Sequence, residues 1–143
     1  MNMTSIIEIL TARWQHATNL LLGIWLVISP WALGYVDQAA AALNASVIGV
    51  LIALVAASAL VAYQEPPASG ARERGLGKFA PQIAEEWISA ALATWLIVSP
   101  YLLNYAAMPA ASWTHFAVGV LVLALTVWAA IAAQQSGGVP SKG

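Results

Sequence analysis

Cysteine is absent from the 143-residue sequence, which excludes disulfides, thiolate metal sites and a cysteine nucleophile. Charge is also scarce, because Asp, Glu, Lys and Arg make up 8% of the residues, against about 25% in ordinary soluble domains. The net charge of −1 provides no basic surface for nucleic acid, so no nucleic-acid partner is expected. By contrast, 61% of the residues are hydrophobic. This composition favours an integral membrane protein over a soluble or disordered one.

Stretches without a formal charge mark the candidate membrane spans. They cover 14–36, 38–64 and 87–141, and the last is long enough for two spans and a turn. About 20 apolar residues cross a hydrocarbon core of about 30 Å, and backbone groups in lipid must be paired, which favours helices. The sequence therefore predicts an all-α, polytopic membrane protein with four transmembrane helices, at about 14–35, 43–63, 83–104 and 112–133.

The two halves of the chain are copies of one helical hairpin. An offset of 70 positions aligns Trp25-Leu-Val-Ile-Ser-Pro-Trp31 with Trp95-Leu-Ile-Val-Ser-Pro-Tyr101. The same offset pairs Tyr35 with Tyr105 and Gly49 with Gly119. Consistent matches at one offset indicate an internal duplication. Since each copy contains two spans, both copies enter the membrane from the same side, as parallel repeats.

Four segments follow from this duplication. Residues 1–63 hold an N-terminal amphipathic turn and the first hairpin, and residues 83–133 hold the second hairpin. Residues 64–82 are rich in Pro, Gly and charge and are predicted to be a cytoplasmic linker. Residues 134–143 are predicted to be a flexible C-terminal tail.

The repeated Ser-Pro-aromatic motif resembles that of the SPW-repeat family of small prokaryotic membrane proteins, over about residues 14–133. The first copy has the motif intact at Ser29-Pro30-Trp31. The second reads Ser99-Pro100-Tyr101, which keeps an amphipathic aromatic residue but loses the indole donor. The resemblance implies the fold and a membrane location, and it implies no activity.

The prolines of the motif remove a backbone donor inside a span. Pro30 leaves the carbonyl of Leu26 without its helical partner, as Pro100 does for Leu96, so a kink is expected at each site. The preceding serines can donate to the carbonyls of Trp25 and Trp95, a bond that bends a helix but does not satisfy the freed carbonyl. A kink with an aromatic anchor is the first interpretation, and a ligand or partner site at the paired kinks is the second.

The aromatic residues near the motif are assigned by their position along the predicted spans. Trp31 with Tyr35, and Tyr101 with Tyr105, are four apart and are expected on one helix face at the outer membrane boundary. Trp25 and Trp95 are deeper and are expected to pack between helices. The two tyrosines and the two deeper tryptophans are candidate ligand-binding residues: Trp25, Tyr35, Trp95 and Tyr105.

The two histidines are the remaining candidates for holding a ligand. His16 is predicted near the cytoplasmic start of the first span and His115 near the outer start of the fourth, about 20 Å apart in depth. This separation excludes a bis-histidine haem within one subunit. The first interpretation is that both are interfacial residues bonded to water or headgroups, with no cofactor and no metal. Either could singly ligate a haem or pigment.

Small residues recur every four positions in the second predicted span and indicate close helix packing. They are Ala45, Gly49, Ala53 and Ala57, and Gly119 is the repeat equivalent of Gly49. Packing within the four-helix unit is the first interpretation, and a dimer interface is the second.

The sequence predicts a non-catalytic accessory or scaffold subunit that packs against itself or other membrane proteins in the bilayer. No charged residue falls in the middle of a span and no catalytic constellation is found, so an enzyme is not expected and an ion-coupled transporter is disfavoured. The alternatives are a binder of a quinone, pigment, haem or lipid, and a small transporter. All five Lys and Arg residues fall on one face of the membrane, which predicts that both termini are cytoplasmic. The resemblance to the SPW-repeat family implies that this membrane is a prokaryotic plasma (inner) membrane.

Overall fold

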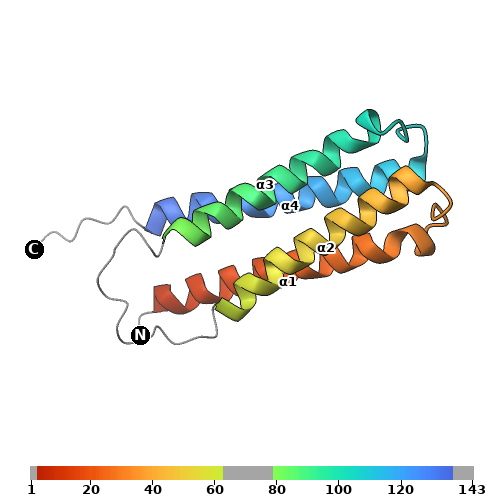
Figure 1. The fold of residues 1–143 in the computed structure, drawn as a ribbon. Coiled ribbons are helices and arrows are strands. Elements are labelled where there is room, and N and C mark those ends of the chain that lie inside the picture. Colours follow the sequence, from red (N-terminus) through yellow and green to blue (C-terminus); the bar gives the residue numbers. More distant parts are fainter. Residues whose placement is uncertain (1–2, 63–78, 137–143) are drawn as a thin grey trace, which may run out of the picture.

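The computed structural model describes residues 3–62 and 79–136, which form four α-helices and no strand. The helices are α1 (Met3–Ala32), α2 (Ala39–Ala62), α3 (Phe79–Leu102) and α4 (Pro109–Ser136). Consecutive helices pair into two hairpins, and the α1–α2 and α3–α4 turns lie at the same end of the bundle (Figure 1). The two hairpins are therefore parallel copies of one unit.

Every observed helix begins before its predicted span; α1, α2 and α3 also end slightly earlier than predicted, whereas α4 ends later. α1 begins at Met3, so the expected N-terminal turn is continuous with the first helix. α3 begins at Phe79 and α4 reaches Ser136. Residues 63–78, which include the remainder of the expected linker, and residues 137–143, which are most of the expected tail, lie outside the described residues.

Two of the four helices are long and apolar enough to cross a membrane by length and composition alone. These are α2, over Ala39–Val61, and α4, over Pro109–Ala132. α1 and α3 carry the Ser-Pro motifs, tryptophans and most of the charged residues of the described part, which lower their hydropathy. These two apolar helices support a membrane protein.

The motif prolines lie in the last turn of their helices. α1 continues for only two residues after Pro30, and α3 for two residues after Pro100. The prolines therefore shape helix ends, whereas the sequence alone predicted kinks within spans that continued to residues 35 and 104. At this place each proline still removes the donor of the carbonyl four residues earlier, but only two helical residues follow its ring.

Packing is closest within each hairpin. α1 packs mainly on α2 and α3 on α4, while α1 also contacts α4 and α2 contacts α3 to join the hairpins. A Cβ atom built on Gly49 would lie 2.7 Å from the carbonyl oxygen of Gly23, so these two backbones touch directly. Gly119 packs in the same way against the Ala93 carbonyl, at 2.9 Å. The small residues thus serve contacts inside the hairpins.

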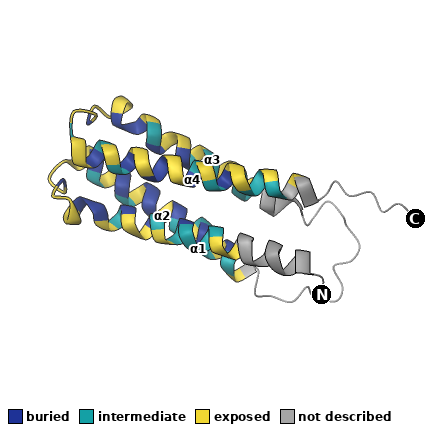
Figure 2. Cartoon of the chain, turned by 180° about the vertical axis from the view of Figure 1, so that it is seen from behind, coloured by how far each residue is buried: buried dark blue, intermediate teal, exposed yellow. Residues whose placement is uncertain are grey.

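The interior of the bundle holds a small set of polar side chains among apolar ones, and the exterior holds large apolar side chains. Figure 2 shows buried stripes facing the neighbouring helices and exposed residues along the outside. The buried polar residues are Asn19, Ser29, Asn44, Ser99, His115 and Thr126. Between the polar groups at the turn end and those farther along lie Leu26, Leu96 and Val122, all fully buried.

Candidate functional site

Each motif helix ends in a turn that folds the chain back onto its own last residues. The backbone N–H of Tyr35 donates to the carbonyl of Pro30, at 2.9 Å, and Gly34 between them has a φ of 71°. A bond from the sixth residue to the first with a left-handed residue before it is the Schellman type of helix end. It returns the side chain of Tyr35 to the turn that contains the Ser-Pro pair.

The second copy builds the same turn with a different residue in the left-handed position. Tyr105 N–H donates to the Pro100 carbonyl, at 3.0 Å, and Asn104 has a φ of 59°. Glycine and asparagine are the residues that most readily adopt this conformation. The two copies thus share the geometry of this helix end as well as the Ser-Pro-aromatic motif.

The serine of each motif satisfies the carbonyl that its own proline leaves free. Ser29 Oγ donates to the carbonyl oxygen of Leu26, at 2.8 Å, and Ser99 Oγ donates to that of Leu96, at 3.3 Å. The expected bonds to Trp25 and Trp95 are therefore wrong by one residue. The difference matters physically, because an unpaired carbonyl in an apolar interior is costly, and the Ser-Pro pair supplies its own replacement donor.

Tyr35 completes this arrangement in the first copy. Its hydroxyl is hydrogen-bonded to Ser29 Oγ, and the side chain is 1% exposed. Because Ser29 uses its proton on the Leu26 carbonyl, the tyrosine hydroxyl is the donor in this bond. Tyr35 therefore does not share an outer face with Trp31, which is 63% exposed on the last turn of α1. The expectation of an exposed pair failed because α1 ends before Tyr35.

The second copy has a larger network, because Asn44 of α2 enters it. Ser99 Oγ and the Tyr105 hydroxyl lie 2.9 Å apart, and Asn44 Nδ2 donates to both, at 2.9 Å each. The two amide protons match the two acceptors, and Tyr105 then donates to Ser99. All three side chains are buried, so their polar atoms are satisfied by one another instead of by water.

Asn44 also fixes the indole of Trp95. Trp95 Nε1 donates to Asn44 Oδ1, at 2.8 Å, and this bond connects α3 of the second hairpin to α2 of the first. Sequence reasoning missed Asn44. The available signal was a carboxamide inside a charge-free stretch, at a position where the second copy has Thr114. A polar residue near a predicted span that breaks the repeat is a candidate for a contact between the copies.

His115 lies in the centre of the polar site. It is fully buried, its Nδ1 donates to the carbonyl of Ala111 at 2.7 Å, and its ring centroid lies 5.2 Å from that of Tyr105 and 6.3 Å from that of Tyr35. Its Nε2 is buried without a hydrogen-bond partner among the described residues. The expected interfacial, water-bonded histidine is therefore wrong here, because α4 turns this face towards the two tyrosines.

His16 is at the opposite end of the bundle. Its Nδ1 lies 3.3 Å from Oε1 of Glu85, so the pair joins α1 to α3 away from the turns. The histidines thus cannot share a ligand, in agreement with their separation in sequence. Within the described residues, no group of three or more His, Cys, Asp or Glu side chains could hold a metal ion.

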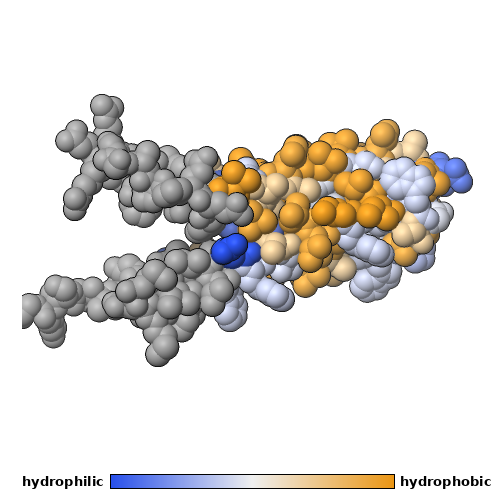
Figure 3. Space-filling model, turned by 90° about the horizontal axis from the view of Figure 1, so that it is seen from below, coloured by the Kyte–Doolittle hydropathy of each residue, from blue (hydrophilic) through white to orange (hydrophobic). Residues whose placement is uncertain are grey.

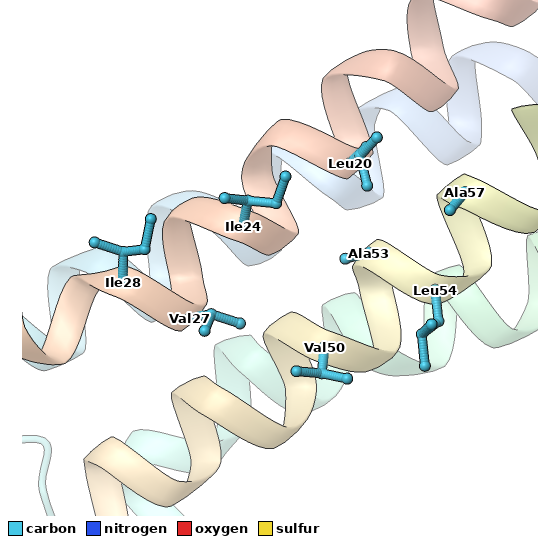
Figure 4. A pocket seen from close by; sticks show the side chains of 8 residues that line it. All are labelled: Leu20, Ile24, Val27, Ile28, Val50, Ala53, Leu54 and Ala57. Carbon is cyan, nitrogen blue, oxygen red and sulfur yellow. The ribbon is translucent and has the colours of Figure 1, made fainter.

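Two hollows accompany the polar site. One, of about 350 Å³, lies between α1 and α2 and has an entirely apolar lining, to which Ile24, Ala53 and Ala57 contribute (Figure 4). The other, of about 360 Å³, lies beside the second motif between the end of α3 and the start of α4. Its lining includes Pro100, Tyr101 and Trp113, so it has aromatic walls at the turn end.

The polar groups of the site pair with one another inside an apolar bundle. They lie at the Ser-Pro turns of both copies, and apart from His115 Nε2 they are satisfied within the chain.

Comparison with curated proteins and with solved structures found no significant match. A comparison with protein families matched the SPW repeat domain over residues 13–129, which contain both motifs and all the buried polar residues described above. The chain therefore belongs to the SPW repeat family.

Proposed function

We propose that the chain is a four-span integral membrane protein whose bundle acts as a non-catalytic scaffold or accessory subunit. The apolar exterior supports the membrane placement of all four helices. In Figure 3, hydrophobic residues cover the middle of the visible face, and the strongly hydrophilic residues lie towards the ends of the described part. The exterior of a water-soluble bundle is instead mainly polar and charged.

α1 and α3 fit this placement despite their lower hydropathy. α1 exposes Leu21, Ile24 and Ile28, and α3 exposes Ile88 and Val98, whereas their serines at the motif are turned inwards. In a spanning helix, polar residues are tolerated where they face the bundle and find partners. The polar content that lowers the hydropathy of these helices is thus compatible with crossing a bilayer.

Exposed aromatic residues also support membrane spans for α1, α3 and α4. They occur in pairs along single helices, one near each end of the bundle, and each of these side chains is more than 60% exposed. The pairs are Trp14 and Trp31 on α1, Trp87 and Tyr101 on α3, and Trp113 and Trp128 on α4. At about 1.5 Å per residue these spacings are about 21 to 26 Å. Belts at that separation suit the two boundaries of a bilayer.

The observation that carries the scaffold proposal is the buried network of Ser99, Tyr105, Asn44 and Trp95. Its polar groups are used in joining the hairpins, so they hold one arrangement of four helices and are not directed at a reacting molecule. A rigid bundle with an apolar outer surface is suited to packing against other helices in the membrane, where close contact drives association.

Extraction from native membranes into mild detergent tests this proposal. We expect the chain to migrate on native gels as a multimer or within a larger complex, with no turnover of its own. The matched sample is the same protein after transfer to a harsh detergent, in which the complex dissociates and the monomer remains helical. A strictly monomeric chain in native membranes that catalyses a reaction or carries an ion flux would contradict the proposal.

Binding of a lipophilic ligand is the second candidate function. The hollow beside Tyr101, with Trp113 and Phe116 in its lining, has a volume within the range of small-molecule sites. A small transporter has less support, because the fully buried Leu26, Leu96 and Val122 fill the interior between the polar groups of the two ends. Absorbance and mass spectrometry of gently purified protein separate the binder from the scaffold, since a stoichiometric pigment or quinone favours the binder.

A further inference from the structure

The duplication places two tryptophans at equivalent positions, and only one of them finds a hydrogen-bond partner for its indole N–H among the described residues. Trp95 Nε1 donates to Asn44 Oδ1, at 2.8 Å. Trp25, the equivalent residue of the first copy, is 45% exposed, and its indole N–H makes no hydrogen bond with any described residue. The half-exposed Trp25 of the first hairpin therefore has an indole N–H that no described residue accepts.

The missing partner is explained by one substitution between the copies. The position equivalent to Asn44 is occupied by Thr114 on α4, and α1 contacts α4 as α2 contacts α3. Thr114 Oγ1 donates to the carbonyl of Ala110, at 2.7 Å, within its own helix. The threonine side chain is also shorter than that of asparagine and has no carbonyl oxygen. The acceptor that satisfies Trp95 thus has no counterpart for Trp25.

The depth of Trp25 makes an unpaired N–H costly. Trp25 lies seven residues before the end of α1 at Ala32, which is about 10 Å along the helix axis. The exposed Trp31 can place its indole N–H at the membrane boundary, where water and headgroups accept, whereas Trp25 lies within the apolar region. A donor without a partner in hydrocarbon is penalised by several kcal/mol in transfer experiments.

The residues around Trp25 determine what kind of molecule can bring an acceptor to its indole N–H. The residues one turn away on either side, Leu21 and Ile28, are exposed and apolar, and α1 has no formal charge between Arg13 and its end. An ionised group would lose its hydration here without a counter-charge. We propose that Trp25 is the hydrogen-bonding residue of a binding site for a neutral lipophile, whose carbonyl oxygen accepts from the indole N–H. This inference rests on the membrane placement proposed above.

Two lipophiles supply a neutral carbonyl: a lipid whose glycerol ester is drawn below the boundary along α1, and a quinone, whose ring enters the apolar region; lipid chemistry distinguishes them. The full chain is placed in nanodiscs of diester phosphatidylcholine, of diether phosphatidylcholine, and of diether phosphatidylcholine with a decyl-substituted benzoquinone. The indole N–H resonances are recorded by ¹⁵N NMR and assigned with Trp25→Phe and Trp95→Phe.

We expect the Trp25 proton resonance to lie downfield in at least one of the two carbonyl-containing discs and to return upfield in diether lipid alone. A downfield position in the diester disc identifies the ester, and one that requires the quinone identifies the quinone. The Trp95 resonance serves as the internal reference and is expected to stay unchanged. A Trp25 resonance that is the same in all three discs would overturn the inference, and it would leave the membrane placement and the scaffold function intact.

Two variants at one position give a matched control. Thr114→Asn supplies the carbonyl that the second copy already uses, so the Trp25 resonance should stay downfield in every lipid, including the diether. Thr114→Val removes the hydroxyl without adding an acceptor and should leave the lipid dependence as in the wild type. Continued lipid dependence in folded Thr114→Asn would contradict the assignment of the missing partner. Failure of the wild-type chain to enter nanodiscs would contradict the membrane placement and, with it, this inference.

Discussion

Ser29 Oγ lies 2.8 Å from the carbonyl oxygen of Leu26, the group that loses its helical donor because residue 30 is proline. The motif thus contains both the proline that removes the backbone donor and the serine that replaces it. Tyr35 then donates to the same serine oxygen, and the helix end that contains Gly34 brings the tyrosine back to it. The spacing from serine to tyrosine is a property of this helix end, and it recurs in the second copy with Ser99 and Tyr105.

Ser29→Ala is expected to lower the free energy of unfolding by about 1–3 kcal/mol, because the Leu26 carbonyl and the Tyr35 hydroxyl lose a buried partner. Reversible denaturation in mixed micelles measures the change. Ser58→Ala is the matched control, since Ser58 is exposed and donates to a carbonyl three residues earlier as Ser29 does. Equal effects of the two variants would show that the motif serine has no special role.

Pro30→Ala and Ser29→Ala together form a double-mutant cycle. Pro30→Ala restores a backbone N–H for the Leu26 carbonyl, so Ser29→Ala should be less destabilising in that background than in the wild type. Additive effects would show that the serine does not replace the donor lost at the proline. The cycle uses the same denaturation measurement.

Asn44→Leu is expected to weaken the contact between the hairpins by about 2 kcal/mol. The variant removes one residue that bonds to Ser99, Tyr105 and Trp95, and bonds between membrane helices contribute about 0.6 kcal/mol each on average. The emission maximum of Trp95, isolated as a difference against Trp95→Phe, should shift when its N–H partner is lost. Unchanged stability together with unchanged emission would contradict the bridging role of Asn44.

Gly49→Ala is expected to destabilise the first hairpin itself. The added Cβ would lie 2.7 Å from the Gly23 carbonyl oxygen and 2.9 Å from the Val27 backbone nitrogen, so the two helices must separate. Val50→Leu is the control, because Val50 is exposed on the same turn of α2. A variant that lost only its association with other chains, with its hairpin intact, would instead favour the dimer-interface interpretation of this position.

Introduced cysteines test the orientation. With both termini cytoplasmic, a cysteine at Gln38, in the α1–α2 turn, should react with a membrane-impermeant thiol reagent in intact cells. Cysteines at Ser69 and Ser141, which lie outside the described residues, should react only after the cells are opened. The native chain has no cysteine and gives no background. Labelling at position 69 from outside would reverse the topology.

Several features of the protein follow from the sequence by itself. The charge-free stretches indicated helices because a chain in lipid must pair its own backbone groups, and four helices are observed. The constant offset indicated two copies, and the family match over residues 13–129 agrees with the Ser-Pro motifs that suggested it. These conclusions depend on composition and periodicity, which are local properties of the chain.

Only the tertiary structure decided where the polar side chains go. Helical spacing placed Tyr35 on the face of Trp31, and position along the predicted span placed His115 at the boundary. Both are buried, because α1 ends before Tyr35 and the packing of the two hairpins places His115 beside Tyr35 and Tyr105. Asn44 contacts residues more than 50 positions away, and no local pattern identifies such a partner. A single buried polar residue is specified by the groups that surround it, and these come together only when the two hairpins pack.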